Sequence, residues 1–156
     1  MRVLSKSKLL ASLQCSKRLW LEIHHPELNE DSKQTKAAFS VGNSIGSIAR
    51  KIYDPHGQGT ILDVTKGGIG AALTRTTELL SKSYPIFEAG FTANGALAFA
   101  DALIPDPERG EQNWRMVEVK SSTSVKDYHR DDIAVQSYMA RNTGLNVNGP
   151  LLSYVD

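Results

Sequence analysis

The chain has 156 residues and a mass of 17.1 kDa, which fits one domain and leaves little room for two. Apolar residues make up 40% and charged residues 22% of a chain with a net charge of +1, a balance that excludes coating nucleic acid by bulk positive charge. No apolar stretch approaches the ~20 residues of a membrane span, and the first residues lack the apolar run of a signal peptide. Cys15 is the single cysteine, so no internal disulfide is possible. We therefore expect a cytoplasmic protein with no membrane partner.

Positive charge is concentrated in the first third of the chain. Residues 1–50 carry eight Lys or Arg against four Asp or Glu, whereas residues 51–156 carry ten against thirteen. Lys17 and Arg18 belong to a cluster within the first twenty residues that contains no acid. Two interpretations of this cluster stay open: a small nucleic-acid contact, or the solvated face of an amphipathic helix.

Residues 1–58 are predicted to form a helical part of the domain. A helix capped by Ser5 or Ser7 is expected to run to about residue 21, and residues 28–36 predict a polar loop. A second helix is predicted over 37–53, and Pro55 is expected to end it. The side chains expected to face the core are Leu9, Leu13 and Trp20 in the first helix and Phe39, Ile45, Ile48, Ala49 and Ile52 in the second.

Residues 59–156 are predicted to form a mixed-sheet core within the same domain. A short strand over 60–64 leads through a flexible, glycine-rich entry at 66–70 into a helix that ends near residue 81. Strands over 84–92 and 96–104 flank Asn94-Gly95, a strong hairpin signal. A strand over 114–120, a helix over 131–142 and a strand over 150–155 follow. The expected fold class is therefore α/β, with a mixed sheet flanked by helices and an N-terminal helical extension.

Two neighbouring strands carry acidic residues inside apolar runs. Side chains alternate along the strand over 114–120, so Glu118 and Lys120 share one face with Met116. Asp101 lies within the apolar run of the preceding strand, and an isolated buried carboxylate needs a cation, a metal or strong donors. If the strands are adjacent, Asp101 and Glu118 converge with Lys120 beside them.

Converging carboxylates are typical ligands of Mg²⁺, which takes oxygen ligands and keeps positions for water and substrate phosphate. A metal ion held in this way polarises a phosphodiester and lowers the pKa of bound water, and a nearby ammonium positions that water or stabilises developing charge. The alternative interpretation of Glu118 and Lys120 is an exposed cross-strand ion pair with no function.

The order of elements and these motifs resemble the RecB-like branch of the PD-(D/E)XK nuclease superfamily. The aspartate of the family pattern falls on Asp101 in FADALIPD, and its (D/E)xK falls on Glu118-Val119-Lys120. The resemblance implies a restriction-endonuclease-like core, in which Asp101, Glu118 and the Val119 carbonyl bind Mg²⁺ or Mn²⁺. It also implies a helical glutamine at Gln136 and an assisting acid, a further metal ligand, at Glu88 in YPIFEAGF.

The N-terminal sequence LLASLQCSKRLW is similar to the opening of CRISPR-associated exonucleases with an iron–sulfur cluster and of uncharacterised bacterial RecB-like proteins. Such a cluster needs four cysteines, and Cys15 alone cannot supply it, so we expect a fragment of a longer protein or a form without a cluster. Cys15 is expected to be a small buried apolar residue. Two family positions differ: Gly46 stands where relatives carry a histidine in G-x-x-x-H, and Ala140 stands where they carry a tyrosine after the glutamine.

Several polar residues are candidates for contacts with substrate. Ser121, Ser122, Tyr138, Lys17 and Arg18 are assigned to nucleic-acid binding, although the serines also fit a solvated loop that caps the next helix. Gln136 shares a helix face with Asp132, so it either contacts the substrate backbone or metal-bound water, or forms a hydrogen bond with Asp132.

The leading hypothesis is a Mg²⁺- or Mn²⁺-dependent deoxyribonuclease, by resemblance an exonuclease, with DNA as its partner and with further domains of a longer protein beside it. In this hypothesis Asp101 and Glu118 bind the metal ion, and Lys120 positions the attacking water. The alternative is a non-catalytic module with a nuclease-like fold that binds nucleic acid or a partner protein, which the glycine at position 46 and the missing tyrosine and cysteines favour.

Overall fold

The computed structural model describes residues 3–29, 33–110 and 112–156, without the side chains of 33–36. These residues form five α-helices and a seven-stranded mixed sheet. The helices are α1 (Lys6–Gln14), α2 (Ser16–His24), α3 (Lys33–Tyr53), α4 (Val64–Leu80) and α5 (Asp127–Asn142). The strands are β1 (Leu4–Ser5), β2 (Thr60–Ile61), β3 (Ile86–Ala93), β4 (Ala96–Pro105), β5 (Asn113–Lys120), β6 (Asn146–Val147) and β7 (Leu151–Tyr154).

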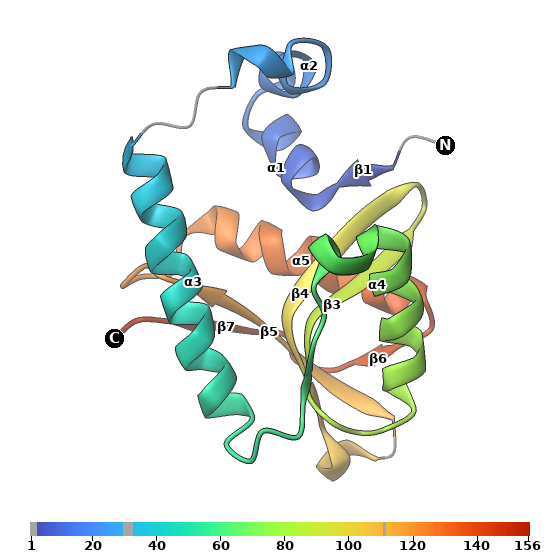
Figure 1. The fold of residues 1–156 in the computed structure, drawn as a ribbon. Helices are drawn as coiled ribbons and strands as arrows, with labels where there is room; N and C mark the ends of the chain where they lie inside the picture. The colour runs from blue at the N-terminus through green and yellow to red at the C-terminus, as the bar shows by residue number, and fades with distance from the viewer. Residues whose placement is uncertain (1–2, 30–32, 111) are drawn as a thin grey trace.

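The first predicted helix is two helices, which is a correction to the sequence-based expectation (Figure 1). Ser5 caps α1 as expected, because its hydroxyl accepts a hydrogen bond from the Lys8 backbone at 3.4 Å. Cys15 then adopts an extended conformation and separates α1 from α2. Leu13, before the break, and Trp20, after it, are 68% and 51% exposed rather than in the core, and Cys15 is exposed.

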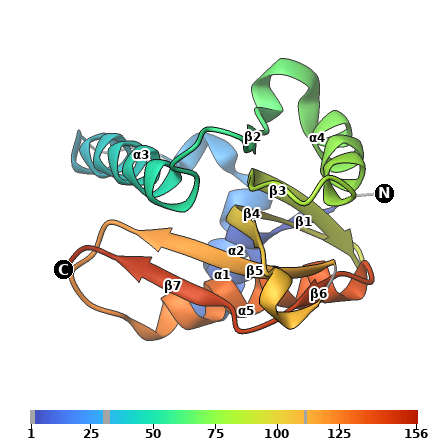
Figure 2. The same cartoon turned by 90° about the horizontal axis from the view of Figure 1, so that it is seen from below.

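Helix α3 starts four residues earlier than predicted and presents its apolar side chains to the outside. Phe39, Ile48 and Ile52 are all more than half exposed, and Ala49 is the buried residue of the helix among its described side chains. The expected inward face is therefore wrong for these three residues. Figure 2 shows α3 over one face of the sheet and α5 over the opposite face.

The β3–β4 hairpin forms at the predicted turn, since Asn94 and Gly95 both have positive φ angles of 51° and 76°, which suits a two-residue hairpin turn. β5 pairs antiparallel with β4, and α5 crosses over to β7, which pairs parallel with β5. β2 pairs parallel with β3 at the other side of the sheet, and β1 pairs parallel with β4. The predicted order of helix, three strands, helix and strand is confirmed, with the short β6 as an addition before β7.

Helix α4 includes the glycine-rich segment at 66–70, which was predicted to be a flexible helix entry. Gly68 has a φ of 77° and interrupts the first turns of the helix, a conformation that glycine adopts without steric cost. Further along, the Thr76 hydroxyl accepts a hydrogen bond from the Gly90 backbone at 2.9 Å. This contact ties α4 to β3, the strand that carries Glu88.

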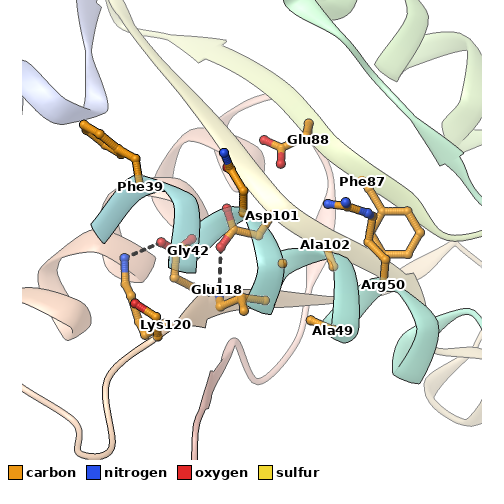
Figure 3. Close-up of a pocket in the computed structure, with 14 residues that line it drawn as sticks. Phe39, Gly42, Ala49, Arg50, Phe87, Glu88, Asp101, Ala102, Glu118 and Lys120 are labelled. Atoms are coloured by element: carbon orange, nitrogen blue, oxygen red, sulfur yellow. Dashed lines mark hydrogen bonds and ion pairs between the residues drawn. The ribbon is translucent and has the colours of Figure 1, made fainter. Parts of the chain in front are cut away.

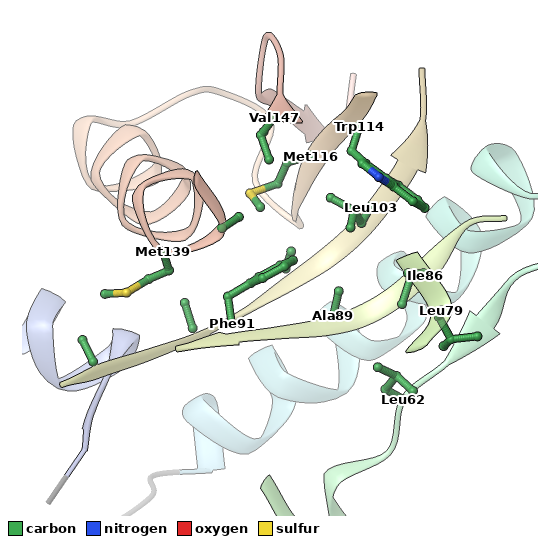
Figure 4. Packing of buried hydrophobic residues seen from close by; sticks show 14 residues of the cluster. Leu62, Leu79, Ile86, Ala89, Phe91, Leu103, Trp114, Met116, Met139 and Val147 are labelled. Carbon is green, nitrogen blue, oxygen red and sulfur yellow. The ribbon is translucent and has the colours of Figure 1, made fainter. Parts of the chain in front are cut away.

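The hydrophobic core lies between the sheet and its helices (Figure 4). Leu103, Trp114 and Met116 are almost completely buried and meet Met139 of α5. Trp114 is thus a core residue, whereas Trp20, which was expected to face the core, is not. None of the helices in the described ranges is long and apolar enough to cross a membrane.

Candidate active site

Three acidic residues occupy one row across neighbouring strands. The β3–β4 register, continued through this position, sets Glu88 opposite Asp101. The β4–β5 register, continued in the same way, sets Asp101 opposite Glu118. The sequence-based expectation that the strands bearing Asp101 and Glu118 are adjacent is confirmed. Adjacent strands are only ~4.8 Å apart, so the sheet itself places the three residues next to one another.

The sheet is irregular along this row. Glu88 has a φ of 58°, a conformation that is uncommon for residues other than glycine and is often found at functional sites. Regular β4–β5 pairing stops at Ala102, and the Asp101 carboxylate accepts a hydrogen bond from the Val119 backbone at 2.7 Å. A side chain therefore continues the contact where the backbone ladder ends, and the strands part to leave room for a pocket.

The pocket above this row has a volume of about 510 Å³ (Figure 3). Its floor contains Glu88, Asp101 and Glu118, together with Val119, Lys120 and Ser121 from the end of β5. Helix α3 supplies the opposite wall, in which Gly42, Gly46 and Arg50 follow one another at four-residue spacing and so share a helix face. Phe39 lies at one end of this wall.

Glu118 is the most enclosed acid of the row, at 2% exposure. The Lys120 ammonium lies 2.6 Å from its Oε1 and the Lys6 ammonium 3.5 Å from the same atom. Gln136 donates a hydrogen bond from Nε2 to Oε2. Burial, followed by the charge of Asp101, raises the pKa of Glu118 to about 7. The carboxyl group is therefore poised to exchange a proton for a cation near neutral pH.

Lys6 and Asp132 belong to the same charge cluster, although sequence reasoning assigned neither to the site. The Lys6 ammonium lies 2.7 Å from Asp132 Oδ1, and Lys120 forms an ion pair with Asp132 Oδ2. Burial works to lower the pKa of Lys120, but the charges of Glu118 and Asp132 outweigh it and raise that pKa. Lys120 is therefore held as an ammonium. The interpretation of Glu118 and Lys120 as an exposed ion pair is wrong, because both side chains are largely buried.

Arg50 is a third cationic residue at the pocket that the sequence analysis did not single out. Among the described residues its guanidinium group forms no ion pair or hydrogen bond, and it lies on the Glu88 side of Asp101, away from Lys120 (Figure 3). Burial and the charge of Asp101 raise the pKa of Glu88, while the Arg50 charge opposes that rise. The four-residue spacing of Gly42, Gly46 and Arg50 was the sequence signal that could have placed Arg50 on the helix face toward the pocket.

Of the two roles considered for Gln136, the hydrogen bond with Asp132 is not present, whereas a contact with substrate or metal-bound water stays a prediction. The side chain is fully buried and contacts Glu118, not Asp132, and it does not line the pocket. Its Oε1 is a buried atom without a hydrogen-bond partner in the described part of the chain. Gln136 therefore acts on the pocket through Glu118, by fixing the orientation of that carboxylate.

The remaining candidate residues lie away from the pocket, Ser121 excepted. Ser122 donates a hydrogen bond to the Ser124 carbonyl at 2.8 Å, and the Tyr138 hydroxyl accepts one from Asn94 at 2.8 Å. Lys17 and Arg18 line a separate hollow beside Cys15, and Arg18 forms an ion pair with Glu22 at 2.8 Å. The structure does not bring these four residues together with Asp101 and Glu118.

The donor set at the pocket consists mainly of carboxylates and carbonyls. Within the described residues, no group of three or more His, Cys, Asp or Glu side chains is arranged to hold a metal ion. Two carboxylates with a backbone carbonyl and water suit Mg²⁺, which is commonly bound through only one or two protein carboxylates. Within 4 Å, a Cβ added at Gly46 would meet only Arg50 Nη1, at 3.7 Å, so the space beside Gly46 is largely open.

Comparison of the chain with protein-family models and with the sequences of curated proteins finds no significant match.

Proposed function

We propose that the protein is a metal-dependent deoxyribonuclease with a restriction-endonuclease-like core, of the RecB-like branch of the PD-(D/E)XK superfamily. The observation that carries the proposal is the row of Glu88, Asp101 and Glu118 across β3, β4 and β5, with Lys120 at its end and a pocket above it. Acids that can hold a metal ion, with an amine beside them, suit metal-assisted hydrolysis of a phosphodiester.

Asp101 and Glu118 would hold Mg²⁺ or Mn²⁺, with the Val119 carbonyl and Glu88 as further oxygen ligands. The donor chemistry fits, because each carboxylate oxygen accepts more than one contact and no hydrogen bond or ion pair to Asp101 Oδ1 is present among the described residues. When bound, such an ion polarises the scissile phosphate and lowers the pKa of its water ligand.

The chain's own residues supply the remaining functions. Lys120 presents an ammonium at the pocket and orients the attacking water or stabilises charge on the phosphate oxygens. Gln136 fixes the orientation of the Glu118 carboxylate through its hydrogen bond to Oε2. Arg50, whose side chain forms no ion pair among the described residues, contacts a phosphate of the substrate from the α3 wall.

The test is cleavage of end-labelled linear and circular DNA with Mn²⁺. We expect the parent to cleave linear DNA and Asp101→Asn to be inactive, whereas Asp131→Asn, an exposed acid outside the pocket, should cleave like the parent. Cleavage of the circular substrate would reveal an endonuclease. Equal cleavage by the parent and Asp101→Asn would overturn the proposal.

A non-catalytic nuclease-like module is the second candidate, and two observations favour it. Gly46 has no side chain at the position where the resemblance implies a histidine, and no group of three or more His, Cys, Asp or Glu side chains arranged to hold a metal ion is present in the described ranges. A ligand that binds only the folded protein raises its melting temperature. If the protein is such a module, Mn²⁺ should leave its melting temperature unchanged. If it is a nuclease, Mn²⁺ should raise the melting temperature of the parent but not that of Asp101→Asn.

A further inference from the structure

We propose that Asp132 is a positioning residue of this active site, which together with Lys6 holds the Lys120 ammonium on Glu118. This inference rests on the proposed nuclease function. It assigns a role in the reaction to helix α5 and to the N-terminal helix α1, neither of which lines the pocket.

The contacts form a closed ring of charges. Lys120 lies between Glu118 and Asp132, forming ion pairs with one oxygen of each. Lys6 bridges the same two acids from the other side, at 3.5 Å from Glu118 and 2.7 Å from Asp132. Each amine therefore has two acidic partners. The Lys120 ammonium cannot leave Glu118 without also breaking its contact with Asp132.

Helix α5 is built to fix both sides of Glu118. Asp132 and Gln136 are four residues apart and so lie on one face of the helix. Gln136 donates to Oε2 of Glu118, while Asp132 holds the amine that contacts Oε1. Both α5 side chains are buried. Because they are packed into the helix–sheet interface, they have little freedom to follow an alternative geometry.

The N-terminal segment is anchored to the sheet immediately before Lys6. Leu4 and Ser5 pair with Ala96 and Leu97 of β4, and Ser5 caps the helix that begins at Lys6. The segment thus delivers the Lys6 ammonium from a fixed backbone position, even though it lies more than ninety residues from β5 in the sequence. The pair of Lys6 and Asp132 balances the charge that Asp132 would otherwise add to a buried carboxylate cluster.

The experiment compares Asp132→Asn with Asp131→Asn, its exposed neighbour on the same helix, for which no ion pair is present among the described residues. We expect kcat with Mn²⁺ to fall by about 10–100-fold in Asp132→Asn, as for other residues that support a metal site, with KM for DNA little changed. Asp132→Glu should restore part of the rate. A residue that merely stabilised the fold would lower the melting temperature and leave kcat unchanged.

A second measurement does not depend on nuclease activity. The rate at which Lys120 and Lys6 react with an amine-acylating reagent is followed by peptide mass spectrometry, with exposed Lys82 as the reference amine. Both lysines should react several-fold faster in Asp132→Asn and unchanged in Asp131→Asn. If Asp132→Asn does not fold, Lys6→Met against Lys8→Met gives the same comparison for Lys120.

The outcomes separate the two claims. Unchanged acylation rates, or a kcat of Asp132→Asn equal to that of the parent, would overturn the positioning role alone. Absence of cleavage by the parent would overturn the nuclease, and accelerated acylation in Asp132→Asn would still show that Asp132 holds Lys120.

Discussion

The carboxylate of Asp101 accepts a hydrogen bond from the Val119 backbone N–H at 2.7 Å. This contact lies immediately beyond the last paired residues of β4 and β5. It joins two residues that the proposed site needs, a carboxylate on one strand and a backbone carbonyl on the next. The sheet therefore fixes Asp101 through its own backbone, so that one carboxylate oxygen stays directed at β5 and the other is left for a cation.

Because of this hydrogen bond, two substitutions of Asp101 should differ in their effect on the free energy of unfolding. Asp101→Asn keeps an acceptor oxygen for Val119, so its free energy of unfolding should stay close to that of the parent. Asp101→Ala leaves the Val119 N–H without that acceptor and should lower the free energy of unfolding by about 1–3 kcal/mol. Urea unfolding measures both values. Equal stability of the two variants would contradict this account of the strand junction, whatever their activity.

Arg50 should contribute to binding of DNA and not to the chemical step. Because the Arg50 side chain forms no ion pair among the described residues and lines the pocket, Arg50→Ala should raise KM and leave kcat within a few-fold of the parent. Loss of one phosphate contact should also reduce the slope of log binding constant against log salt by about 0.7–0.9. Lys51→Ala, at the exposed neighbouring position, is the control. An unchanged salt slope in Arg50→Ala would rule out the phosphate contact.

Stability should depend on pH through Glu118. Its pKa is about 7 in the folded protein and about 4.3 in an unfolded chain, so between these values the folded state binds a proton that the unfolded state has released. The free energy of unfolding therefore falls as pH rises through this window. Glu118→Gln lacks this titration, so it should lose less stability than the parent between pH 5 and pH 8 in urea unfolding. Parallel losses in both proteins would show that Glu118 does not titrate there.

Because the space beside Gly46 is open, a metal-ligating side chain introduced there should raise the affinity for a metal ion. Gly46→His would place an imidazole on the α3 wall above Asp101, where a Cβ meets only the end of Arg50. Mn²⁺ should then raise the melting temperature more than it does in the parent. Gly46→Ala is the matched control, because it shares the gain in helix stability of about 0.5–1 kcal/mol without adding a ligand. A Mn²⁺ effect that is the same in both variants would exclude the pocket wall from the metal site.

Much of the core followed from local patterns in the sequence. Asn94-Gly95 defined the hairpin, and the order of the elements made β4 and β5 neighbours, which placed Asp101 beside Glu118. The alternation of β5 correctly put Glu118 and Lys120 on one side. These features depend on residues close together in the sequence, for which turn chemistry and side-chain periodicity are informative.

The errors arose where distant segments decide the structure. The periodicity around Cys15 favours one continuous helix, and only the structure shows the extended residue that divides it. The apolar residues of α3 suggested a buried face, yet its glycine face turns toward the sheet and leaves Ile48 and Ile52 exposed. Lys6 and Asp132 could not be assigned to the site, because nothing local links the start of α1 to a face of α5.

The most direct test of the central claim is the rate of DNA cleavage with Mn²⁺ by Lys120→Ala and by Lys82→Ala. Lys82 is exposed and lies outside the pocket, so the second variant carries the same change of charge without touching the site. The account predicts that Lys82→Ala cleaves at the rate of the parent and that Lys120→Ala is slower by about 10²–10³-fold. Equal rates in the two variants would contradict the assignment of this pocket as a nuclease active site.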